Sequence, residues 1–142
     1  MKYQKQCDHC GHQETAYAHP LNRGLVLAFK ALAEYYLANR RACNVNRELN
    51  LSHNQLANFQ KLRYFGLVSD TPQGWYPSPL GLEWYRGEVS ILNPAGSLSN
   101  VPLADDHEAW KTHAKKRTAV RITDYVAVEY KKRDEYAGER LF

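Results

Sequence analysis

Apolar positions in the first half of the chain recur with the spacing of a long helix. From Leu21 to Asn39 they return every three or four residues over about five turns, which predicts an amphipathic helix. Asn22 is expected to cap its start, and Arg40 and Arg41 complement the negative end of its dipole. The apolar face is broad, so we interpret it as core. A dimer interface is the alternative interpretation.

A second helix is predicted from Ser52 to Phe65. Ser52 is a good N-cap because its hydroxyl can accept a hydrogen bond from a backbone N–H one turn later. Gly66 follows where a helix commonly ends in a left-handed residue. The apolar residues of the segment recur at three-residue steps and predict one buried stripe: Leu56, Phe59, Leu62 and Phe65.

A hairpin and a short helix are predicted next. Leu67–Ser69 and Trp75–Pro77 have strand composition, and Thr71–Gly74 between them has turn composition. Ser78 and Pro79 then start a helix that stops at Gly87, since proline is well suited to the first helical position. Upstream, the pattern predicts a short strand at Ala42–Val45 that pairs with the hairpin, and a helix of barely more than a turn at Asn46–Asn50.

The order helix, short helix, helix, hairpin, helix resembles the winged-helix superfamily. More narrowly, four segments resemble a group of bacterial and phage winged-helix proteins: Lys61–Val68, Gly74–Tyr76, Ser78–Gly81 and Arg86–Glu88. The resemblance implies a winged helix-turn-helix domain over residues 21–88, with the helix after Ser52 as the recognition helix.

The helix face opposite the apolar stripe has a composition that suits DNA. It carries histidine, asparagine, lysine and tyrosine, and no carboxylate occurs from Ser52 to Tyr64. Amides can pair with adenine edges, and cations suit phosphates or guanine. The hairpin tip carries Asp70 and no cation, so it is not expected to grip phosphate. The predicted DNA-contacting residues here are Ser52, His53, Asn54, Asn58 and Lys61.

The first 20 residues contain a Cys-x2-Cys-Gly segment, which is typical of one half of a zinc knuckle. Cys7 and Cys10 would supply two thiolates, and Gly11 allows the tight turn. No second Cys-x2-Cys is present, so the other ligands must come from elsewhere. We assign His12 and His19 to zinc and leave open the alternatives His9, Cys43, His107 and His113, or a hairpin that binds no metal.

Residues 89–142 form a basic extension with mixed α and β patterning. A strand is predicted at Val89–Leu92, a turn at Asn93–Ser97 and a loop at Asn100–Asp106. A helix through Trp110 and a strand from Val120 to Tyr130 follow. Trp110 is interpreted as an anchor that holds the extension to the winged core.

The extension contains the most basic part of the chain. Between Lys111 and Arg133 there are eight Lys or Arg residues against two acidic ones. Lys115, Lys116 and Arg117 are predicted to contact DNA phosphates. The alternative is a solvated charged face.

Composition limits the function further. The chain has 142 residues and a net charge of +4, which modestly favours polyanionic partners. No apolar run reaches membrane-spanning length, and three cysteines fit a reducing, cytoplasmic compartment. No catalytic motif is present, so an enzyme is not expected. We expect an α+β protein, monomer or homodimer, that binds double-stranded DNA as a small transcriptional regulator. The alternative is a protein-interaction adaptor that lacks sequence-specific DNA binding.

Overall fold

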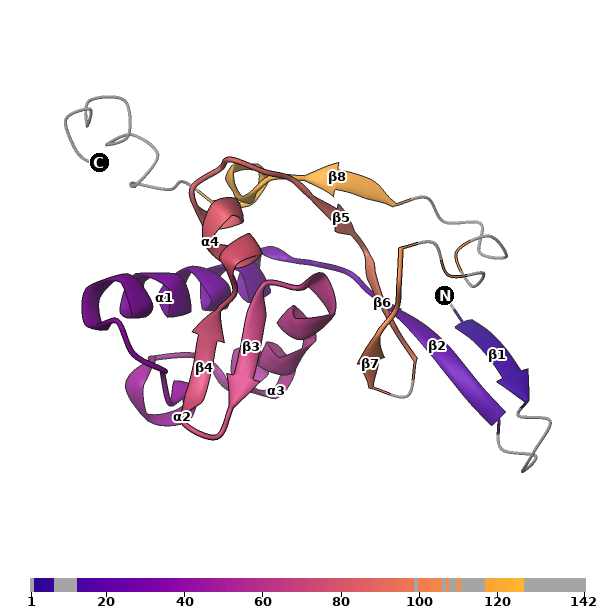
Figure 1. Ribbon diagram of the computed structural model, residues 1–142, viewed down its shortest axis with the longest axis horizontal. Coiled ribbons are helices and arrows are strands. Elements are labelled where there is room, and N and C mark those ends of the chain that lie inside the picture. Colours follow the sequence, from indigo (N-terminus) through magenta and orange to yellow (C-terminus); the bar gives the residue numbers. More distant parts are fainter. Residues whose placement is uncertain are drawn as a thin grey trace.

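The computed structural model describes residues 2–6, 13–98, 100–105, 107, 110 and 117–126. Helices and small antiparallel sheets are mixed in these ranges, as expected for an α+β protein. A helical unit occupies one side of the molecule, and a sheet extends away from it on the other (Figure 1). Within the described ranges, no helix is long and apolar enough to cross a membrane.

The helical unit comprises the segments from α1 to α4, and the name "helix–hairpin unit" is used for it below. α1 packs against β4, α3, η1 and α4, so it is the central element of the unit (Figure 1). The elements are α1 (Arg23–Asn39), α2 (Val45–Glu48), α3 (His53–Asn58), the 3₁₀ helix η1 (Phe59–Phe65), β3 (Val68–Thr71), β4 (Gly74–Pro77) and α4 (Pro79–Tyr85).

The capping residues predicted for this unit are confirmed. Asn22 Oδ1 accepts from the Leu25 amide at 2.9 Å. Ser52 Oγ accepts from the Gln55 amide at 3.1 Å, and Gln55 Oε1 accepts from the Ser52 amide at 2.8 Å. Ser78 caps α4, and Gly66 is left-handed with φ of 77°. The predicted bridge between residues 42–45 and the hairpin is also present, as a Cys43–Trp75 pair.

The second long helix differs from the prediction in its second half. α3 is α-helical only to Asn58, and the chain continues as the 3₁₀ helix η1. A 3₁₀ helix has three residues per turn, so side chains three apart eclipse one another. Phe59, Leu62 and Phe65 therefore all face the core, and each is at most 7% exposed. The three-residue spacing in the sequence matches this geometry. Leu56, which belongs to the predicted stripe but lies in α3, is only half-buried.

The core of the unit is built on the inner face of α1. Val26, Phe29 and Leu32 are fully buried there, which confirms the core interpretation of this face. The Phe29 and Trp84 rings pack with centroids 5.7 Å apart. Trp84 Nε1 donates to the Val120 carbonyl at 3.0 Å, and this bond ties the chain after residue 117 to the same core.

The extended part of the molecule contains a four-stranded antiparallel sheet of order β1–β2–β6–β7 and a separate pair, β5–β8 (Figure 1). The sheet joins strands from both ends of the sequence, so the predicted N-terminal segment and C-terminal extension form one layer. The strands are β1 (Lys2–Gln6), β2 (Gln13–His19), β5 (Ile91–Asn93), β6 (Ala95–Leu98), β7 (Val101–Pro102) and β8 (Thr118–Val120).

The predicted turn at Asn93–Ser97 is wrong. Ala95–Leu98 is strand β6, which pairs with β2 in the register Tyr17 to Ser97. Its small residues allow close packing: a β-carbon on Gly96 would lie 2.7 Å from the Trp110 ring. Burial of this Gly- and Ser-containing segment overrides its local turn preference.

The predicted strand from Val120 to Tyr130 is also wrong within the described residues. β8 ends at Val120, and Ile122–Asp124 forms the 3₁₀ turn η2. Asp124 closes this turn because its Oδ2 accepts from the Arg121 amide at 2.8 Å, while Ile122 is fully buried. The predicted helix through Trp110 and the residues after Val126 lie largely outside the described ranges.

Candidate nucleic-acid interface

The starts of α1 and α3 meet at a cleft of about 500 Å³. Gln55 holds the two helices together there, since its Nε2 donates to the Gly24 carbonyl at 2.9 Å. The lining is dominated by amide and small side chains: Asn22, Gly24, Leu25, Ser52, Asn54, Gln55 and Asn58.

Two segments without carboxylates form this cleft. Residues 15–33 and residues 49–69 contain no Asp or Glu, although 15 acidic residues occur in the chain. Each segment carries cations: Arg23 and Lys30 in the first, Lys61 and Arg63 in the second. The fold thus brings together two segments that contain cations and no carboxylate, although none of these four cations lines the cleft itself.

Three of the predicted DNA-contacting residues lie at this cleft or beside it, where a ligand could reach them. His53 and Asn54 are exposed on the first turn of α3. Asn58 is half-buried, and its Nδ2 donates to the Asn54 carbonyl at 2.8 Å, which fixes the direction of its amide. Ser52 also lines the cleft, and its hydroxyl oxygen is engaged in the capping box that starts α3.

Lys61 lies apart from this group. It belongs to η1, which packs against β6 and β7. Tyr64 of η1 stacks on His19 of β2, with ring centroids 4.7 Å apart. His19 is hydrogen-bonded through Nε2 to Ser97 Oγ at 2.7 Å. Burial, and secondarily the charge of Lys61, lower the pKa of His19. The second half of the predicted recognition helix therefore packs against the sheet on one side.

Arg117 is a structural residue in this fold, which corrects the prediction that it contacts DNA. Its side chain is only 12% exposed and pairs with Asp105 at 2.8 Å. Its Nε donates to the Pro94 carbonyl at 2.8 Å, and its guanidinium carbon lies 4.2 Å from the centre of the Trp110 ring. A cation held on three sides is not available to phosphate. Lys115 and Lys116 lie outside the described residues.

Trp110 is an anchor, but its contacts differ from those predicted. It packs in a small cluster with Ala16, Leu98 and Leu103, all in or next to the four-stranded sheet. The tryptophan therefore secures the sheet, whereas the prediction placed it against the helical core.

The structure separates the predicted zinc ligands. Gln6 pairs with Gln13, so Cys7, Cys10 and His12 fall in the connection between the paired ends of β1 and β2. His19 is at the other end of β2, about 20 Å along the strand at 3.3 Å per residue, so it is removed from the predicted ligand set.

Cys43, one alternative ligand, is fully buried in the helix–hairpin unit, and burial raises its pKa to about 11. In the part of the chain that the structure describes, no three His, Cys, Asp or Glu side chains form a metal-binding group. Cys7, Cys10 and His12 themselves lie outside the described residues, and zinc binding stays a prediction.

Comparison of the chain with models of known protein families, with curated proteins and with solved structures finds no match. The interface therefore has to be judged on its own geometry. The sequence did not indicate that the start of α1 belongs to it. The only available signal was the lack of carboxylates in residues 15–33, which becomes informative once those residues lie beside α3.

Proposed function

We propose that this protein is a winged-helix protein that binds double-stranded DNA through the first turns of α3 and the start of α1. The observation that carries the proposal is the cleft where two carboxylate-free segments meet, with exposed His53 and Asn54 beside it. The element order α1, α2, α3, hairpin, α4 supports a winged helix with α3 as the element that enters the major groove (Figure 1).

The side chains of α3 suit base recognition. Asparagine can pair with both the N6 and N7 groups of adenine, so Asn54 is the residue we assign to base recognition. His53, beside it, can donate to a base or a phosphate. The Nδ2 of Asn58 donates to the Asn54 carbonyl, and the Oδ1 of Asn58 takes no part in that bond. Asn58 thereby supports the same surface.

Phosphate contacts are expected at α1. Its first turn presents backbone N–H groups and the positive end of a 17-residue helix, and Arg23 is exposed there. The hairpin β3–β4 carries exposed Asp70, so it does not supply this function. Because η1 packs against β6 and β7, we assign the groove contact to α3.

The adaptor function remains the second candidate, and two observations favour it. The packing of η1 against β6 and β7 shortens the surface available to DNA, and the hairpin tip has no cation to hold a phosphate. An adaptor should fail to bind duplex DNA at low salt, whereas a DNA-binding protein should bind it.

Selection of binding sites from random duplexes tests the proposal. The wild-type protein is expected to enrich a sequence motif, and Asn54→Ala is expected to relax it at one position at a cost of about 1–3 kcal/mol for that base. Asn46→Ala, an exposed asparagine on α2, is the matched control and should leave the motif unchanged. Equal enrichment by wild type and Asn54→Ala would contradict the assignment, and no enrichment at all would favour the adaptor.

Zinc binding by Cys7, Cys10 and His12 is part of the same proposal. The register of β1 with β2 supports it, because it brings the two ends of their connection together. Metal analysis should find about one zinc per chain, since Cys7, Cys10 and His12 would contribute to a single site, and Cys7→Ser with Cys10→Ser should remove it. Metal-free wild-type protein would contradict this part of the proposal alone.

A further inference from the structure

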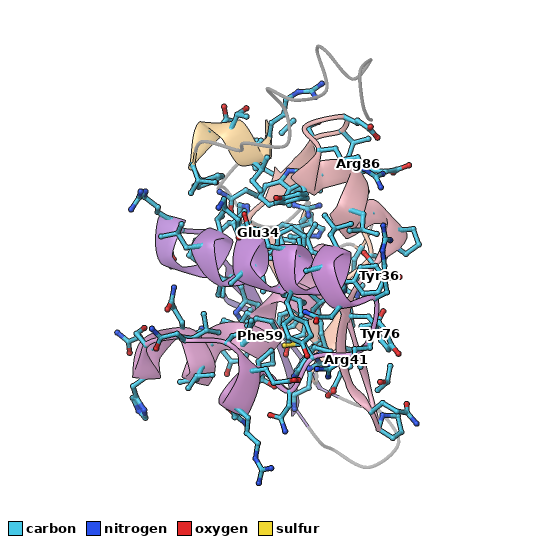
Figure 2. All side chains as sticks on the ribbon, turned by 90° about the vertical axis from the view of Figure 1, so that its left-hand side faces the viewer. Glu34, Tyr36, Arg41, Phe59, Tyr76 and Arg86 are labelled. Carbon is cyan, nitrogen blue, oxygen red and sulfur yellow. The ribbon has the colours of Figure 1, made fainter. Side chains whose placement is uncertain are left out.

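The C-terminal end of α1 carries two arginines, each next to a tyrosine ring. The guanidinium carbon of Arg40 lies 5.7 Å from the centre of the Tyr36 ring, and that of Arg41 lies 5.2 Å from the Tyr35 ring. Tyr36 also packs edge-on against Tyr76 of β4, with ring centroids 6.0 Å apart. Figure 2 shows Tyr36, Tyr76 and Arg41 gathered at one end of α1. We call this set the Arg–Tyr surface: Tyr35, Tyr36, Arg40, Arg41, Glu48 and Tyr76.

Glu48 fixes half of this surface in place. Its Oε2 accepts from the Tyr35 hydroxyl and pairs with Arg41 Nη1 at 3.1 Å, while its Oε1 accepts from the Asn44 amide at 2.8 Å. The Tyr35 hydrogen bond, followed by the Asn44 amide, lowers the pKa of Glu48, so the carboxylate is ionised at neutral pH. Its oxygens are occupied within the protein, and Arg41 is oriented before any partner arrives. Such pre-organisation reduces the entropic cost of binding.

The charge of the surface is not balanced within the described residues. Glu48 is already engaged by Arg41, and no carboxylate in the described ranges pairs with Arg40. Arg47, beside Glu48 on α2, is exposed as well. An acidic ligand is therefore the complement that this surface lacks.

We propose that the Arg–Tyr surface binds an acidic segment of a partner protein. Tyrosine and arginine are enriched among residues that dominate protein–protein binding, because they offer rigid contact area with a polar or charged end. Side-chain carboxylates spaced along an extended segment can pair with Arg40, which no carboxylate of the described ranges engages, without lying over Glu48. A continuous phosphate backbone would meet the ionised Glu48, so nucleic acid is the weaker candidate.

This surface is also distinct from the DNA-binding cleft. The cleft lies at the first residues of α1, and the Arg–Tyr surface lies at the other end. A 17-residue helix is about 25 Å long, so both could be occupied together. The inference does not depend on DNA binding and holds equally if the protein is an adaptor.

Fluorescence anisotropy with a labelled 16-residue peptide of alternating glutamate and serine tests the proposal. Arg40→Gly removes the guanidinium, and glycine suits the left-handed backbone there, with φ of 54°. We expect it to weaken peptide binding about three- to fivefold, the loss of one partly exposed ion pair. Arg40→Lys keeps the charge but loses the planar contact with Tyr36, and we expect an intermediate loss.

The matched control is Arg23→Ala, which removes an exposed arginine from the opposite end of the same helix. It changes the net charge equally and should leave peptide affinity unchanged. The proposal is overturned if Arg23→Ala and Arg40→Gly weaken binding equally, or if the peptide does not bind. It is also overturned if a single-stranded oligonucleotide of equal charge binds more tightly and depends on Arg40.

Discussion

The ring of His19 lies on the ring of Tyr64, with centroids 4.7 Å apart and planes inclined by 21°. This contact joins the sheet to η1 of the helix–hairpin unit, and the His19–Ser97 hydrogen bond ties β2 to β6 at the same point. Ser97 is 4% exposed, whereas the two stacked rings are half-buried.

The junction should make stability depend on pH. The folded protein lowers the pKa of His19 below its ordinary value of 6.5, through burial and then the charge of Lys61. Between the folded and the unfolded pKa of His19, the unfolded chain binds more protons. The stabilisation contributed by neutral His19 is therefore complete above pH 6.5 and is lost as the pH falls through the folded pKa. Thermal melts of wild type and His19→Gln between pH 7.5 and 5 measure it.

His19→Gln should lower stability at pH 7.5 by about 1 kcal/mol, the value of one aromatic contact, and flatten the dependence on acid. His53→Gln is the control, since His53 is exposed, and it should follow the wild-type curve. Parallel curves for wild type and His19→Gln would show that His19 is not the titrating group.

The substitution Gly81→Ala tests the packing of α4 against the hairpin. An alanine in a helix interior is ordinarily favoured over glycine by about 1 kcal/mol. A β-carbon at Gly81, however, would overlap the Leu67 carbonyl oxygen and lie 3.2 Å from the Phe29 ring. Overpacking costs about 1–3 kcal/mol and here acts against backbone, so Gly81→Ala should destabilise the protein in urea titration.

Gly24 is the comparison for this substitution. A β-carbon there would meet only Asn22 Oδ1, at 3.4 Å. Gly24→Ala should therefore be neutral or stabilising. Stabilisation by both substitutions would show that the hairpin and α4 do not pack as described.

Arg40 ends α1 in a left-handed conformation, with φ of 54° and ψ of 38°. A side chain in this region costs about 1 kcal/mol relative to glycine. Arg40→Gly should thus be more stable than Arg40→Ala by about that amount, although both lose the contact with Tyr36. Denaturant unfolding of the two variants measures the difference, and a more stable alanine variant would exclude the left-handed cap.

The helix–hairpin unit was predictable because its signals are local. The caps at Asn22, Ser52 and Ser78 and the left-handed Gly66 depend on residues no more than a few positions away, and all four are present. The switch to a 3₁₀ helix at Phe59 was also encoded, in the three-residue spacing, but such long 3₁₀ segments are uncommon and the α-helix was the natural expectation.

The sheet was not predictable because it depends on distant pairing. Ala95–Leu98 has turn composition, and only its contact with β2, almost 80 positions earlier, makes it a strand. The contact of His19 with Ser97 was not predictable for the same reason, because the two residues are far apart in the sequence. Spacing alone had assigned His19 to zinc. Arg117 was misassigned for a similar reason, since its partners Pro94 and Asp105 are 23 and 12 residues away.

The candidate site was predicted in part. The exposed polar face at His53 and Asn54 followed from the helix period. The contribution of α1 did not, because the contact between Gln55 and the Gly24 carbonyl spans 31 residues.

A salt titration of binding to a random duplex shows whether the cleft between α1 and α3 binds duplex DNA. The affinity should fall linearly with salt on logarithmic axes, with a slope reduced by about one in Arg23→Ala. Arg40→Gly, at the other end of α1, should keep the wild-type slope. Absence of binding at low salt, or a slope that Arg40→Gly changes and Arg23→Ala does not, would contradict the claim.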